Sequence, residues 1–149
     1  MASQARTAAA VAAGAVVWAL LWVGGAAIAG ALWPDIILPA QRLDHAGALA
    51  GYLLYSVIVS VAAGYLTARI AQGTSPAVGI LAGIQLLLGL AIELSAWDKT
   101  PAWYHIVFLA LLVPAILFGG NLWQRRSQPR PHAAGVTASL VFAQRAGRT

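Results

Sequence analysis

Four long runs of uncharged, mostly apolar residues constrain the fold of this chain more than any other feature. The runs cover about residues 8–33, 46–68, 76–97 and 102–123, and Glu93 is the only charged residue inside them. Each run reaches the roughly 20 apolar residues that a helix needs to cross a ~30 Å hydrocarbon layer. None carries the polar face at 3.6-residue spacing that is typical of a helix on a soluble protein. The pattern predicts an all-α fold, an antiparallel bundle of four transmembrane helices.

The composition of the chain excludes an ordinary soluble enzyme. Only 9% of the 149 residues are charged and the mean hydropathy is +0.78, whereas about a quarter of the residues in a soluble domain are charged. The chain has no cysteine, which excludes disulfides, thiolate metal sites and a cysteine nucleophile. It also lacks the sequence motifs of serine hydrolases, zinc proteases, phosphate-binding loops and dinucleotide-binding folds. We therefore expect a protein without enzymatic activity, metal or cofactor.

Short polar turns separate the later runs. Residues 72–76 form one such turn, in which Ser75 is the expected N-cap of the next helix, and Thr100 is the expected cap in the turn that follows. Connections this short make neighbouring helices antiparallel and bring them into contact. We expect residues 1–126 to form one transmembrane domain, followed by a flexible basic tail over residues 127–149.

The arginines predict which way the helices face. Four spans put both termini on one side, and that side carries seven arginines: Arg6, Arg69, Arg125, Arg126, Arg130, Arg145 and Arg148. The opposite side carries Arg42 and Lys99 together with all four acidic residues. Because basic residues are retained in the cytoplasm, we expect both termini to be cytoplasmic. No basic face with interleaved aromatic residues exists, so the expected partner is the lipid bilayer and not a nucleic acid.

The N-terminal segment has an alternative interpretation as a secretory signal peptide. Arg6 would supply its basic region and Ala27-Ile28-Ala29 its cleavage site. However, the apolar run exceeds the roughly 7–15 residues of such peptides and continues to Trp33. We therefore expect this segment to remain as the first helix.

Small and polar residues predict how the helices pack. Glycines spaced by four residues allow close approach of membrane helices, and we expect close packing at Gly47/Gly51, Gly79/Gly83, Gly25, Gly30 and Gly89. A polar stripe lies on one face of the second run, at Tyr52, Ser56, Ser60 and Thr67. We expect this stripe to face the bundle, and a substrate groove is the alternative interpretation.

Three polar residues inside the runs are candidates for chemistry: Gln85, Glu93 and His105. Gln85 lies eight residues before Glu93, on the same helical face and about 12 Å deeper. The short connection places Glu93 and His105 at similar depth on adjacent helices. Such a pair is either a structural clamp or a ligand, proton or ion site, since ionisable residues within membranes are rare and often functional. Haem ligation by His45 and His105 is a further alternative, which the small number of histidines disfavours.

The chain resembles a group of small bacterial inner-membrane proteins with four helices. The resemblance rests on three segments: Gly64-Tyr65-Leu66-Thr67-Ala68-Arg69, Pro101-Ala102-Trp103-Tyr104-His105 and Gly119-Gly120. In that group a Gly-Tyr-x-x-Ala-Arg end to the second helix and a Trp-Tyr-His start to the fourth recur. The resemblance implies topology and a bacterial origin, and it carries no activity over to this chain. The eight arginines against one lysine are typical of a GC-rich bacterial genome.

These observations give two expectations for function. The first is a non-enzymatic accessory or structural subunit that acts through helix–helix contacts, with another membrane protein or a second copy as partner. The alternative is a small oligomeric transporter or channel that uses Gln85, Glu93 and His105. Because four helices enclose little space, transport would require more than one copy.

Overall fold

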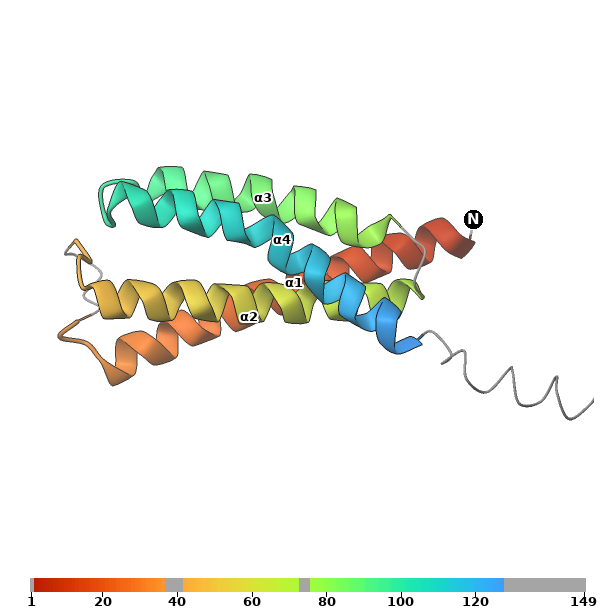
Figure 1. Cartoon of the computed structure of the whole chain (residues 1–149), viewed down its shortest axis with the longest axis horizontal. Helices are drawn as coiled ribbons and strands as arrows, with labels where there is room; N and C mark the ends of the chain where they lie inside the picture. The colour runs from red at the N-terminus through yellow and green to blue at the C-terminus, as the bar shows by residue number, and fades with distance from the viewer. Residues whose placement is uncertain (1, 37–41, 73–75, 128–149) are drawn as a thin grey trace, which may run out of the picture.

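Each of the four apolar runs forms one helix in the computed structural model, which describes residues 2–36, 42–72 and 76–127. The helices are α1 (Ala2–Leu32), α2 (Ala46–Ala71), α3 (Ala77–Ser95) and α4 (Ala102–Ser127). They run up and down beside one another, so that α1 begins and α4 ends at the same end of the bundle (Figure 1). All four are long and apolar enough to cross a membrane. The expected all-helical fold of four helices is confirmed.

Both ends of α2 carry caps that the sequence did not reveal. His45 precedes the helix, and its Nδ1 accepts a hydrogen bond from the amide of Ala48 at 3.1 Å. At the other end, Gln72 adopts a left-handed conformation with φ 59° and donates its backbone N–H to the carbonyl of Ala68. These contacts satisfy backbone groups that a helix end otherwise leaves without partners.

Two residues were expected as helix caps. The hydroxyl of Thr100, the expected cap of α4, lies 2.9 Å from Nε2 of His105. The N-cap residue of α3 is Pro76, and Ser75, the expected cap, lies outside the described residues. The predicted tail also lies outside them from residue 128 onward.

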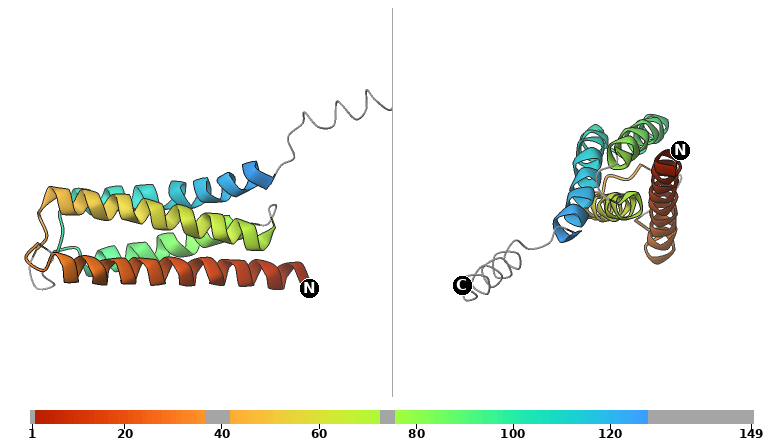
Figure 2. Two further views of the ribbon diagram at one scale, coloured as in Figure 1. Left: turned by 90° about the horizontal axis from the view of Figure 1, so that it is seen from below. Right: turned by 90° about the vertical axis from the view of Figure 1, so that its right-hand side faces the viewer.

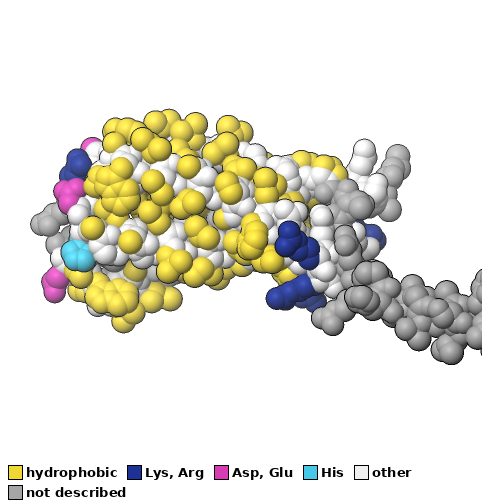
Figure 3. Space-filling view, in the orientation of Figure 1, with side chains coloured by type: hydrophobic (Ala, Val, Ile, Leu, Met, Phe, Trp, Pro, Cys, Tyr) yellow, Lys and Arg dark blue, Asp and Glu magenta, His cyan; other side chains and the backbone are white. Residues whose placement is uncertain are grey.

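The two ends of the bundle differ in charge. The acidic end carries Asp35, Asp44 and Asp98 beside Arg42 and Lys99, and the arginine end carries Arg6, Arg69, Arg125 and Arg126. Figure 3 shows acidic side chains at one end, arginines at the other and apolar side chains between them. Large apolar residues are exposed on the faces between, with Leu20 67% and Leu87 69% exposed. An apolar surface of this extent is suited to lipid and not to water.

The bundle packs around a core at mid-height. α1 packs along α2 and α3, and it reaches α4 through Trp22, whose ring centroid lies 5.6 Å from that of Phe108. Figure 2 shows the four helices end-on, with α1 and α4 on opposite sides of the bundle. The buried core consists of Trp18, Val59, Ala63, Leu81, Ala82, Phe108, Leu112 and Ile116.

Two glycines allow α2 and α4 to approach closely. A Cβ on Gly64 would overlap the carbonyl of Ile116, and a Cβ on Gly119 would overlap the carbonyl of Val61. Each glycine thus receives the backbone of the opposite helix, which is how small residues promote association of membrane helices. In α4 this contact lies on the arginine-end side of Pro114.

The glycine spacing that favoured close packing was a poor guide to the actual contacts. Gly25 packs against the ring of Tyr55, and Gly89 packs against Leu112. By contrast, no other helix lies within 4 Å of a Cβ built on Gly30, Gly47, Gly51, Gly79 or Gly83. Within the described chain, the prediction of close packing at these five glycines is wrong, because spacing alone does not specify which helix face meets a neighbour.

Candidate functional site

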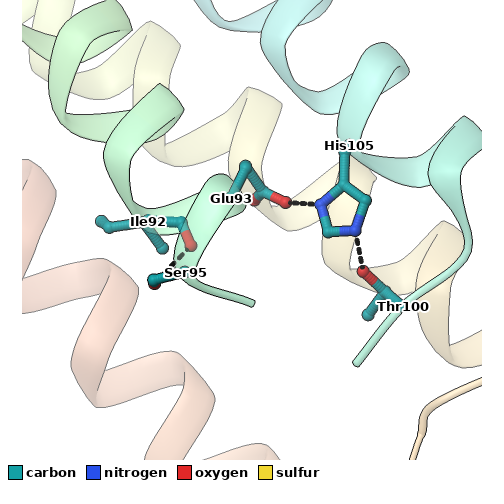
Figure 4. Close-up of polar contacts among 5 residues, drawn as sticks. All are labelled: Ile92, Glu93, Ser95, Thr100 and His105. Carbon is teal, nitrogen blue, oxygen red and sulfur yellow. Dashed lines mark hydrogen bonds and ion pairs between the residues drawn. The ribbon is translucent and has the colours of Figure 1, made fainter. Parts of the chain in front are cut away.

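The structure brings Glu93 and His105 together at the acidic end of the α3–α4 hairpin. Glu93 lies in the last turn of α3 and His105 in the first turn of α4, and they are 6% and 0% exposed. An oxygen of Glu93 bonds Nδ1 of His105, while Nε2 of the same ring lies 2.9 Å from the hydroxyl of Thr100 (Figure 4). Both ring nitrogens therefore have a partner. We call these three residues the hairpin clamp.

Aromatic rings enclose the hairpin clamp. The ring of Trp97 stacks on that of His105, with centroids 4.6 Å apart and planes 15° apart. Tyr104 meets the same imidazole edge-on, with centroids 6.0 Å apart. These contacts keep water from the pair and hold the imidazole in one orientation. The sequence alone did not predict these ring contacts, because they depend on the hairpin geometry.

The two histidines considered for haem do not form a ligand pair. His45 is exposed, and its Nδ1 caps α2. His105 has both nitrogens engaged by Glu93 and Thr100. An axial haem ligand needs a ring nitrogen that faces the iron, so the residues present do not fit this cofactor. Within the described ranges, no group of three or more potential metal-ligating His, Asp or Glu residues occurs either.

Gln85 shares the buried face of α3 with Glu93 but does not join the hairpin clamp. Its side chain is 1% exposed, and neither its amide nitrogen nor its amide oxygen has a hydrogen-bond partner. Gly89 lies between the two residues on the same buried face. Burying an amide without partners is unfavourable by about 1–3 kcal/mol. The spacing predicted this shared face, but the lack of a partner was not predictable from sequence.

The polar stripe of α2 lies mainly inside the bundle. Ser56, Ser60 and Thr67 are buried, and Tyr52 is half-buried. Ser60 accepts a hydrogen bond from the indole N–H of Trp18 at 3.1 Å, which links α2 to α1. Ser56 and Thr67 instead donate to carbonyls of their own helix. Over these two serines and the threonine the geometry is that of a packing seam, whereas Tyr52 lines a groove between α1 and α2.

A groove between α1 and α2 opens at the acidic end, and sequence reasoning missed it. This α1–α2 groove has a volume of about 690 Å³ and is lined by apolar residues such as Leu20, Gly24, Ile28 and Gly51. Its floor is closed by Tyr55, which packs on Gly25 and donates its hydroxyl to the carbonyl of Leu21. Both helices are rich in small residues, which was the only sign of the groove in the sequence. Whether such residues pack together or leave a groove depends on how far the two helices separate.

Comparison of the chain with protein family models, curated proteins and solved structures finds no match.

Proposed function

We propose that this chain is an integral protein of a bacterial inner membrane, with four spans and both termini in the cytoplasm. We further propose that it has no enzymatic activity and serves as an accessory subunit. In this role, the α1–α2 groove binds a transmembrane helix of a partner protein. The acidic end would then face the periplasm and the arginine end the cytoplasm, as the distribution of basic residues favours.

The observation that carries this proposal is the open space beside two glycines of the groove. A Cβ built on Gly24 or Gly51 meets nothing within 4 Å. Inside the chain, Gly64 and Gly119 are covered by the backbone of a neighbouring helix. Small residues let membrane helices approach closely and pack. A groove that exposes two such positions is therefore suited to a further helix.

The low burial of α1 supports the same function. Only 11% of the most apolar stretch of α1 is buried inside the protein, against 28% to 39% for the other three helices. An accessory subunit needs a rigid part and a face that others can bind. Here the close contact of α2 with α4 at Gly64 and Gly119, together with the hairpin clamp, supplies the rigid part. The exposed side of α1 supplies the face that others can bind.

Photocrosslinking in native membranes tests this proposal. A photoreactive amino acid at Ile28, which lines the groove and is 62% exposed, should give an adduct with another protein. The matched control is Leu87 on α3, which is 69% exposed and lies outside the groove. It should give lipid adducts alone. Gly51→Leu should weaken the protein adduct at Ile28 by filling the groove.

The adduct at Ile28 identifies the partner, and its absence rejects the accessory role. Expression of two differently tagged copies of the chain shows whether the crosslinked partner is a second copy of this chain or another protein. Lipid adducts alone at Ile28, or the same protein adduct at both positions, would contradict helix docking in the groove.

A second candidate function is transport of a proton or small cation by an oligomer. The unpartnered amide of Gln85 favours it, because a buried polar group without a partner is often explained by a water or ion that binds there. Glu93 and His105 would then supply the exchangeable groups. In proteoliposomes, Glu93→Gln should abolish a pH-dependent flux that the unaltered protein shows. Equal flux in both proteins would exclude this function.

A further inference from the structure

A second groove lies at the arginine end, between the first turns of α1 and the first turns of α3. This α1–α3 groove has a volume of about 920 Å³. Its walls below the mouth are apolar, with Val11 and Ala15 on α1 facing Ile80 and Ile84 on α3. Its mouth is polar, with Ser3, Gln4 and Arg6. The groove therefore changes from charged to apolar along the helix axis.

The depth of this groove corresponds to one leaflet of a bilayer. Arg6 and Ala15 are nine residues apart on α1, which is about 13 Å along a helix. Half of a ~30 Å hydrocarbon layer is about 15 Å. A molecule with a polar head at Arg6 and an apolar tail beside Ala15 would thus occupy the groove in the orientation of a membrane lipid.

Arg6 is held at the mouth and keeps most of its donors available. Its Nη1 donates to the side-chain oxygen of Gln72 at 2.8 Å, which links the start of α1 to the end of α2. A guanidinium carries five N–H donors in a planar fork that suits phosphate. The contact with Gln72 orients this fork without neutralising its charge.

The arginine end contains no acidic side chain. All four acidic residues of the sequence, Asp35, Asp44, Glu93 and Asp98, lie at or near the opposite end. Arg6, Arg69, Arg125 and Arg126 therefore have no carboxylate side chain as a counter-charge. An anionic group from outside the chain would supply one, and basic pockets between membrane helices bind lipid head groups in this way.

We propose that the α1–α3 groove binds an anionic glycerophospholipid, with its phosphate at Arg6 and one acyl chain along Val11, Ala15, Ile80 and Ile84. Charge complementarity selects an anionic head group, and the apolar walls select a lipid over free phosphate. The bound lipid bridges α1 and α3 at the end where the groove separates them. This inference rests on the proposed membrane placement and is independent of helix docking in the α1–α2 groove.

Native mass spectrometry of the full chain tests the proposal. The protein is released from nanodiscs that contain equal amounts of phosphatidylglycerol and phosphatidylcholine, and retained lipids are counted. The unaltered protein should retain phosphatidylglycerol in preference to phosphatidylcholine. Arg6→Gln should reduce that retention about fivefold, the effect expected for one basic residue at a membrane surface. Arg69→Gln is the matched control, because Arg69 lies at the same end but outside the groove.

A second variant tests the groove with the charge intact. Ile80 is 44% exposed in the groove wall, so Ile80→Trp fills the groove from a position that tolerates a larger side chain. It should reduce phosphatidylglycerol retention while Arg6 is unchanged, and an excess of inorganic phosphate should not displace the lipid from the unaltered protein. The proposal is overturned by equal loss in Arg6→Gln and Arg69→Gln, by full retention in Ile80→Trp, by equal retention of both lipids or by displacement with phosphate. None of these results would alter the Ile28 adduct expected from helix docking.

Discussion

Glu93 and His105 bond to each other across the α3–α4 hairpin although both side chains are buried. The second nitrogen of His105 faces Thr100, and Trp97 stacks on the ring. A buried pair with satisfied partners fixes the geometry of the groups around it, and removal of one member leaves the other uncompensated. The pair therefore joins α3 to α4 whatever further role it has.

Breaking the hairpin clamp should destabilise the protein strongly. We expect Glu93→Ala and His105→Ala each to lower the free energy of unfolding by about 3–5 kcal/mol, because each leaves the other side chain of the pair buried without its partner. The double variant should lose less than the sum of the two single losses, since the second change removes the group that the first left unpaired. Thermal unfolding in mild detergent, followed by tryptophan fluorescence, measures these effects. Asp98→Ala, at an exposed site on the same hairpin, serves as the control. Additive losses would contradict coupling within the pair.

Glycines of the same helical bundle should respond in opposite ways to alanine. Gly64→Ala places a Cβ against the carbonyl of Ile116, and such overpacking should destabilise by about 1–3 kcal/mol. Gly79→Ala meets open space, and it should be neutral or stabilising by up to about 1 kcal/mol because alanine favours helix. Thermal unfolding of the two variants makes the comparison. Similar losses in both would indicate that the contact of α2 with α4 is not the reason for the effect.

The fold was largely predictable because its determinants are local in the sequence. Length, lack of charge and short turns identify helices that are long and apolar enough to span a membrane, without reference to any neighbour. The pairing of Glu93 with His105 was also predictable, since a short connection joins the two turns that carry them. Its identity as a clamp or a transport site was not, because that depends on what the pair binds.

Contacts between distant segments were not predictable in the same way. The approach of Gly64 to Ile116 depends on the rotation of α2 and α4 about their axes, which glycine spacing does not determine. The α1–α2 groove depends on the angle between two helices that share no turn signal. Ser60 was assigned to the correct face, but its partner Trp18 lies 42 residues away and gave no sequence signal.

Replacement of Gln85 by leucine should stabilise the protein. The buried amide has no partner, so an apolar side chain of similar size removes an unfavourable term of about 1–3 kcal/mol. Ser60→Ala is the opposite case, because it takes the acceptor from the indole of Trp18 and should destabilise by about 1 kcal/mol or more. Thermal unfolding checks both. A loss of stability in Gln85→Leu would indicate that the amide binds a water or an ion, which would favour the transport function.

Single cysteines should react from opposite faces of the membrane at the two ends of the bundle. The chain has no native cysteine, so the unaltered protein reports the background. Asp44 and Ser127 are exposed at the acidic and arginine ends. In spheroplasts treated with a membrane-impermeant maleimide, Asp44→Cys should react at once, and Ser127→Cys should react only after the membrane is permeabilised. This follows from retention of the arginine-rich side in the cytoplasm. Reaction of both cysteines from one face would mean that the apolar helices do not cross the bilayer in the proposed arrangement, and both grooves would then lie in a different environment.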